Sequence, residues 1–265
     1  MYAFDYVRPA SLADALKAIG SGEEARPLAG GQTLIPTIKQ RLAMPSSLVD
    51  LSGIAELKGI RRDGSSLTIG AMTTHYEVAS SADVKASIPA LAHLAGHIGD
   101  PAVRSQGTIG GSVANNDPSA DYPAAVLALG ATIVTTQREI PADNFFAGLF
   151  TTALAPGEII KAIRFPVPMK AGYSKFEQRA SRYALIGVFV AQTAGGVRVA
   201  VTGSGANGVF RAPSLEAALS KAFTVDALKG VTVPVTGLLA DIHGNADYRA
   251  SLIPVIAERA VAAAK

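Results

Sequence analysis

The chain of 265 residues contains no cysteine. It therefore cannot form a disulfide, provide a thiolate nucleophile, bind zinc through sulfur or hold an iron–sulfur cluster on cysteine ligands. If iron–sulfur chemistry contributes to the function, another polypeptide must supply the cluster.

The chain also lacks a marked excess of one charge and a long uninterrupted apolar run. The net charge of +3 is spread along the chain, and no basic block alternates with aromatic residues as on a nucleic-acid surface. The richest apolar runs, 123–136 and 184–194, are too short or too interrupted for a membrane span. The opening MYAFDYVR places an acid where a signal peptide has its apolar core. We expect no nucleic acid, no membrane span and a cytoplasmic location.

The apolar fraction of 49% is enough for a sizeable core in one large domain or several small ones. Residue patterns predict helices at 12–19, 34–42, 76–79, 89–98, 121–129, 214–221 and 248–264, and strands at 25–29, 47–51, 67–69, 131–136, 159–165, 174–179, 187–193 and 197–201. Helices and strands mix without a regular βαβ repeat, which indicates the α+β class. Pro166 and Pro168 mark the best domain boundary.

Two short loops, 29–33 (AGGQT) and 108–112 (TIGGS), each carry a glycine pair followed by a polar residue. Without Cβ atoms, such a backbone can approach a ligand and point N–H groups at phosphate oxygens. Either loop alone is weak evidence, because most Gly-Gly pairs are turns. Together they predict two halves of one pyrophosphate cradle. Valine at Gly110 or Gly111 is expected to abolish ligand retention by filling this approach.

The segment 108–123 adds short polar side chains at Ser112, Asn115, Asp117 and Asp121. Turns and helix caps favour the same residue types, so the segment alone is compatible with a ligand site or an elaborate loop. It lacks the lysine of triphosphate-binding loops, and a carboxylate suits sugar hydroxyls better than phosphate. A diphosphate with attached sugar alcohols fits this pattern, and FAD is such a ligand.

Other motifs have simpler explanations. The residues at 203–208 match Gly-x-Gly-x-x-Gly, but Pro213 would disrupt the long helix of a dinucleotide fold. We predict a turn between strands there, and little effect of replacing Gly205 on a cofactor. His93 and His97 have helical spacing without a third ligand nearby, so no metal site is predicted. No hydrolase motif is present, and no catalytic residue is assigned.

The ordered motifs resemble the FAD-binding medium subunit of the molybdenum hydroxylases, the family of the carbon monoxide dehydrogenase, xanthine dehydrogenase and aldehyde oxidase groups. The resemblance covers essentially the whole chain and is more specific than either glycine loop. The matching segments are 29–36, 41–43, 98–104, 108–123, 145–146, 150–154, 158–160, 163–166, 173–188, 241–244 and 248–249.

This resemblance implies a flavoprotein of the vanillyl-alcohol oxidase type. FAD would lie between two N-terminal α/β subdomains, residues 1–55 and 56–167, beside a C-terminal α+β domain with a small antiparallel sheet, residues 168–265. The implied cofactor-binding residues are Leu28, Ala29, Gly30, Gly31, Gln32, Thr33, Leu34, Ile98, Thr108, Ile109, Gly110, Gly111, Ser112, Asn115, Asp117, Asp121, Ile160 and Tyr183.

The resemblance also implies a role for each group of residues. The two glycine loops would bind the pyrophosphate, mainly through backbone N–H groups, and Asp121 would accept hydrogen bonds from sugar-type hydroxyls. Ile98 and Ile160 would flank the flavin. Tyr183 would approach the isoalloxazine, with Lys175 or Gln178 as alternatives. Relatives often have His or Ser where this chain has Gln32 and Thr33, which leaves those two side-chain roles open.

The partners implied are a molybdopterin-containing large subunit and a small subunit with two [2Fe–2S] clusters, in a dimer of heterotrimers. Electrons would pass from the clusters to the flavin and then to an external acceptor. The absence of cysteine disfavours the branch resembling 4-hydroxybenzoyl-CoA reductase, whose flavin subunit binds an additional cluster. Two alternatives are a free-standing FAD-dependent oxidoreductase and an interaction protein that has lost the cofactor. The substrate and the acceptor (NAD, a quinone, oxygen or another carrier) are not set by this sequence.

Overall fold

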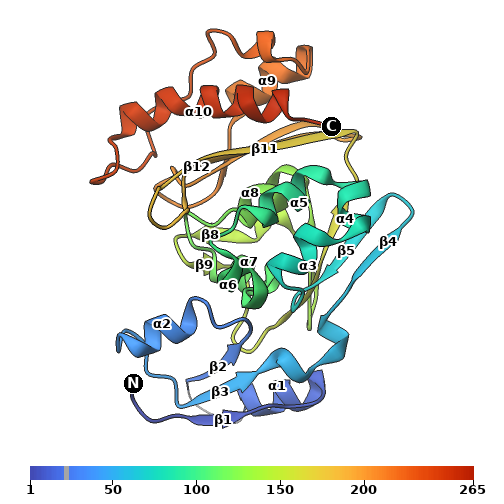
Figure 1. The fold of residues 1–265 in the computed structure, drawn as a ribbon, viewed down its shortest axis with the longest axis vertical. Helices are drawn as coiled ribbons and strands as arrows, with labels where there is room; N and C mark the ends of the chain where they lie inside the picture. The colour runs from blue at the N-terminus through green and yellow to red at the C-terminus, as the bar shows by residue number, and fades with distance from the viewer. Residues whose placement is uncertain (21–23) are drawn as a thin grey trace.

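The computed structural model describes residues 1–20 and 24–265. Three main sheets follow one another along the longest axis, and each takes its strands from one continuous stretch of chain (Figure 1). The N-terminal sheet lies at one end, and α9 (Pro213–Lys221) and α10 (Ala246–Ala262) lie at the other. The mixture of helices and mainly antiparallel sheets confirms the predicted α+β class.

The N-terminal sheet is small and parallel. Its strands lie in the order β1 (Asp5–Val7), β3 (Ser47–Asp50) and β2 (Ala25–Leu28). The helices of this part are α1 (Leu12–Gly20), α2 (Leu34–Lys39), η1 (Leu51–Gly53) and η2 (Ala55–Leu57). The apolar face of α1 packs with Val49, Ile54 and Ile159 in a core of its own. The end of β2 therefore delivers the first glycine loop toward the middle of the molecule.

The middle sheet is antiparallel, in the order β4-β5-β10-β6-β7. Its strands are β4 (Ile60–Asp63), β5 (Ser66–Gly70), β6 (Thr132–Thr135), β7 (Glu139–Pro141) and β10 (Ile160–Pro166), with a separate hairpin of β8 (Phe146–Gly148) and β9 (Thr151–Thr152). The accompanying helices are α3 (His75–Ser80), α4 (Ala82–Ser87), α5 (Pro89–Gly96), α6 (Pro101–Gln106), α7 (Ile109–Asn115), α8 (Tyr122–Ala128) and η3 (Ala142–Asn144). Every residue of α8 is buried, so this helix lies at the centre of the core.

The C-terminal sheet is antiparallel, in the order β11 (Lys170–Glu177), β12 (Ala184–Thr193), β13 (Gly196–Thr202) and β14 (Phe210–Arg211). Successive residues of a strand point to opposite faces. Val188 and Val190 accordingly join the core under α9, η4 (Val225–Leu228) and α10, whereas Phe189 and Ala191 join the core around α5 and α8. The sheet is thus covered by apolar contacts on both faces.

Most predicted elements are found, with shifted ends. The helix predicted at 34–42 ends at Lys39, and the glycine motif at 203–208 forms the turn between β13 and β14, as predicted. Three helices, α4 (Ala82–Ser87), α6 and α7, were not predicted, because α4 and α6 are only 6 residues long and the first turn of α7 contains a glycine pair. No helix of the described residues has the length and apolarity needed to cross a membrane.

Candidate functional site

A groove of about 530 Å³ runs between the N-terminal and middle sheets and reaches the β11–β12 loop. It brings together most of the residues selected from the sequence, although they come from distant parts of the chain. The predicted residues that line it are Ala29, Gly30, Gly31, Gln32, Thr33, Leu34, Ile98, Thr108, Gly110, Gly111, Ser112, Asn115, Asp117, Asp121, Ile160 and Tyr183. Leu28 and Ile109 do not line it, and Ile109 is fully buried in the core beneath.

The first glycine loop packs against the second loop and against the end of α6 just before it. A Cβ atom on Gly30 would lie 2.1 Å from the carbonyl oxygen of Gln106, and one on Gly111 would lie 3.4 Å from the Cβ of Ala29. Gly31 adopts a φ of +70°, which favours glycine. The predicted pairing of the loops therefore agrees with the geometry.

The first loop has open hydrogen-bond donors. Within residues 1–20 and 24–265, no acceptor is found for the backbone N–H groups of Gly30, Gly31, Gln32 and Thr33. Unpaired N–H groups around a glycine turn form an anion-binding concavity. This loop can therefore accept a diphosphate without giving up bonds of its own.

The second loop differs from the expectation, because it is the first turn of α7. Its N–H groups already donate within the protein: Ile109 to Thr73 O, Gly110 to Ala71 O, Gly111 to Thr108 Oγ1 and Ser112 to Thr108 O. The expectation that backbone N–H groups of both loops are the main donors is thus not met in the second. Its open groups are instead the side chains of Ser112 and Asn115, which line the groove and have no hydrogen-bond partner in the described part of the chain.

Asp121 is 4% exposed and lies at the edge of the groove. Tyr173 Oη donates to Asp121 Oδ1, and the Lys175 ammonium lies 3.1 Å from the same oxygen and 3.4 Å from Oδ2. Burial raises the pKa of Asp121, and Lys175 and Tyr173 offset part of that rise. Both carboxylate oxygens face protein donors, so a sugar hydroxyl would share an acceptor that is already engaged.

Ile98 and Tyr183 line the groove from separate segments, the α5–α6 connection and the β11–β12 loop. Burial and the negative charges of Asp117 and Asp121 raise the pKa of Tyr183, so its phenol stays neutral. The two alternatives to Tyr183 do not line the groove: Lys175 is buried behind it, and Gln178 borders a separate pocket of about 310 Å³.

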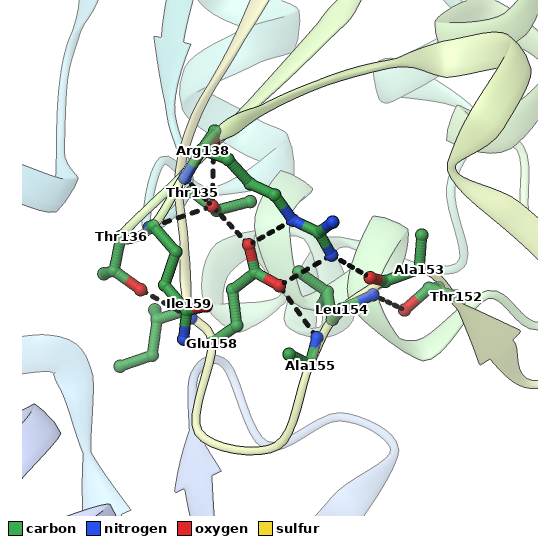
Figure 2. Close-up of polar contacts among 10 residues, drawn as sticks. Thr135, Thr136, Arg138, Thr152, Ala153, Leu154, Ala155, Glu158 and Ile159 are labelled. Atoms are coloured by element: carbon green, nitrogen blue, oxygen red, sulfur yellow. Dashed lines mark hydrogen bonds and ion pairs between the residues drawn. The ribbon is translucent and has the colours of Figure 1, made fainter.

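Glu158 organises the segment that carries Ile160 into the groove (Figure 2). Its side chain is fully buried and accepts from Thr135 Oγ1 at 2.6 Å, the Ala155 N–H at 2.8 Å, and Arg138 at 3.2 and 3.3 Å. Burial by itself raises the pKa of Glu158, but these donors outweigh it and hold the pKa below its ordinary value. No local sequence pattern indicates this role, because it depends on partners 20 and 23 residues away.

His75 is a second groove residue that the sequence does not indicate, because no motif surrounds it. It is 4% exposed, and its Nδ1 has no partner among the described residues. Burial, with a smaller contribution from the positive charge of Arg104, lowers the pKa of His75 to about 4. The groove is therefore lined by a neutral imidazole at physiological pH.

The buried histidine predicts a pH dependence of stability. Below about pH 6.5 the unfolded chain takes up a proton at His75 that the folded chain binds only near its pKa of about 4. Stability that is fully present above pH 6.5 is thus lost as the pH falls toward 4. Urea unfolding should show the wild type losing about 2 kcal/mol more than His75→Phe between pH 7 and pH 5. The same pH dependence in both chains would contradict this assignment.

The motifs set aside from the sequence stay outside the groove. The glycine turn at 203–208 does not line it, and no helix starts at Gly208. The rings of His93 and His97 contact each other in a tilted arrangement, with centroids 4.2 Å apart and planes at 45°, and His97 Nδ1 contacts the carbonyl of His93. No group of three or more metal-ligating side chains occurs in the described residues.

A groove with open N–H donors, polar side chains and an apolar wall is suited to a dinucleotide cofactor. Residues 2–168 match the family described as the FAD binding domain in molybdopterin dehydrogenase. The chain belongs to this family. It is accordingly an FAD-containing oxidoreductase subunit, and FAD is its cofactor.

Whole-length relatives agree. The chain is 38% identical to the carbon monoxide dehydrogenase medium chain of Afipia carboxidovorans, over 99% of this chain and 96% of the relative. It is 35% identical to the glyceraldehyde dehydrogenase medium chain of Sulfolobus acidocaldarius, over 97% and 96%. A solved carbon monoxide dehydrogenase from Hydrogenophaga pseudoflava matches with a TM-score of 0.87 and 36% identity, over 99% of this chain and 97% of that chain.

Proposed function

We propose that this chain is the electron-transfer medium subunit of a molybdenum hydroxylase, which receives electrons from [2Fe–2S] clusters of a partner and delivers them to an external acceptor. The observation that carries the proposal is the paired-loop groove in a chain similar over its whole length to medium chains. When bound, FAD can accept electrons singly and release them as a pair. The protein's own part is to bind, orient and shield the cofactor.

We assign the diphosphate to the open N–H groups of residues 30–33, with Ser112 and Asn115 contributing side chains from α7. Asp117 and Asp121 lie on the groove toward the β11–β12 loop and would face sugar-type hydroxyls. Ile98, Ile160 and Tyr183 would enclose the isoalloxazine ring. The neutral Tyr183 phenol can donate one hydrogen bond without adding charge beside the ring.

The partners we infer are a molybdopterin-containing large subunit and a small [2Fe–2S] subunit, in a dimer of heterotrimers. The relatives are named as medium chains of such dehydrogenases, and this chain has no cysteine with which to bind a cluster. We further infer three domains, residues 1–55, 56–167 and 168–265, since each main sheet is drawn from one of these stretches. A cytoplasmic location stays a prediction.

Co-expression with the neighbouring reading frames tests the function. We expect a complex that contains molybdenum, iron–sulfur and flavin absorbance, and an isolated chain that takes up FAD, with a band near ~450 nm, but turns over no small substrate alone. Substrate turnover by the isolated chain would instead indicate a free-standing oxidoreductase. A chain that never takes up FAD would indicate an interaction protein that has lost the cofactor.

A further inference from the structure

Lys175, on β11, carries a buried ammonium group that the proposed cofactor contacts do not use. Its side chain is only 5% exposed. The ammonium donates to the carbonyl of His97 at 2.7 Å and to the carbonyl of Arg182 at 2.8 Å, and it pairs with Asp121 at 3.1 Å. A lysine ammonium has three donors, and here three acceptors meet them. Because each of its N–H donors has an acceptor, the Lys175 ammonium can be buried without a large desolvation cost.

The three acceptors belong to segments that are distant in the sequence. The carbonyl of His97 directly precedes Ile98, and the carbonyl of Arg182 directly precedes Tyr183. Ile98 and Tyr183 both line the groove, whereas Lys175 does not. The ammonium therefore lies behind the wall and joins the peptide groups from which these two side chains extend.

The β11–β12 loop accepts a hydrogen bond from the Lys175 ammonium at a backbone of unusual conformation. Arg182 has a φ of +61°, a conformation that a non-glycine residue rarely adopts. Within the loop, the Arg182 N–H donates to Gln178 O and the Gln178 N–H donates to Tyr183 O. These bonds close the loop on itself, and Lys175 ties the closed loop to the α5–α6 connection.

We propose that Lys175 is a positioning residue that sets the separation between Ile98 and Tyr183, and with it the slot for the flavin ring. This inference rests on the proposed function, because the slot matters only if the groove holds FAD. A competing role is charge compensation, in which Lys175 serves only to neutralise the buried carboxylate of Asp121. If Lys175 only compensates charge, its removal should not matter once Asp121 is neutral. If Lys175 positions the two segments, its removal should still weaken FAD binding.

Hydrogen–deuterium exchange of the full chain without FAD tests the positioning directly. In Lys175→Met we expect residues 97–104 and 178–183 to exchange on the order of tenfold faster, while α10 is unchanged. Lys170→Met is the matched control, since Lys170 lies on the same strand with an exposed side chain. A uniform increase over the whole chain, or no change in either segment, would overturn the proposal.

FAD titration then separates positioning from charge compensation. We expect Lys175→Met to weaken FAD binding on the order of tenfold and to increase iodide quenching of the bound flavin. The double variant D121N/K175M, which removes both charges and so guards against misfolding, should remain about tenfold weaker than D121N alone. Equal affinity of these two chains would assign Lys175 to charge compensation and refute our inference. If the wild type binds no FAD, the proposed function fails, while the exchange result still decides how Lys175 acts on the two segments.

Discussion

Replacing Gly110 with valine is expected to give a chain that purifies without FAD and binds added FAD at least about 100-fold more weakly than the wild type. A Cβ atom at this position would lie 2.4 Å from the Cβ of Ala71 and 2.7 Å from its carbonyl oxygen. The Gly110 N–H donates to that same carbonyl at 2.9 Å. The side chain would push α7 away from the end of β5 and separate Gly111 from Ala29.

The reason for this effect differs from the one that the sequence suggests. The new side chain meets the protein behind the cradle and not the path of the phosphate. Gly205→Val is the matched control: its Cβ would lie 2.1 Å from the Gly208 carbonyl, so it strains a turn equally, but outside the groove. We expect this control to lose stability and keep FAD in proportion to the folded fraction. Equal flavin content in Gly110→Val and wild type, measured by absorbance per chain, would refute the placement of the cradle.

Glu158→Gln is expected to reduce the free energy of unfolding by about 3 kcal/mol, since bonds between a buried charge and its donors contribute about 1.5–3 kcal/mol each. Glutamine places an NH₂ group where the carboxylate accepts, either against Thr135 Oγ1 or against the Ala155 N–H. The segment from Ala153 to Ile160 would loosen with it, so FAD affinity should fall as well. Urea unfolding and FAD titration measure the two effects.

The pH dependence of this variant separates a charge effect from a change of shape. The pKa of Glu158 is lowered in the folded state, so its contribution is present above the ordinary glutamate pKa and is lost as the pH falls through the folded value. The wild type and Glu158→Gln should therefore converge in acid, where the carboxyl is protonated. Glu139→Gln is the control, because Glu139 pairs with Arg164 at the surface and such pairs contribute little. A difference that persists unchanged at acid pH would rule out the charge explanation.

The sequence predicts helices, strands and turns that follow from local residue patterns. It also predicts the glycine loops, whose role follows from the backbone freedom of glycine. The strand before Gly30 and the turn at 203–208 follow from apolar spacing and glycine placement, and both occur as expected. The meeting of the two glycine loops also follows, because their shared chemistry indicates a shared ligand.

What the sequence does not reveal depends on tertiary partners. Nothing near residue 110 indicates that its N–H is already bonded to Ala71, so the second loop looks like a free donor. Asp121 likewise looks available, because its partners Tyr173 and Lys175 lie 52 and 54 residues further along the chain. Pattern identifies residues with the right chemistry, but only packing decides which of their atoms stay open.

One face of the C-terminal sheet packs into the same core as the helices of the middle part of the chain, so the two parts are not independent. The family match ends at residue 168, yet Tyr173, Phe189 and Ala200 belong to the same core as α5 and α8. A polypeptide ending at the family boundary would leave the apolar outer face of those helices in water, which favours aggregation. The inferred middle and C-terminal domains therefore share one apolar core, and we expect the matched region to need the last sheet for a stable fold. A shortened version of this chain that is meant to bind FAD should therefore retain the last sheet.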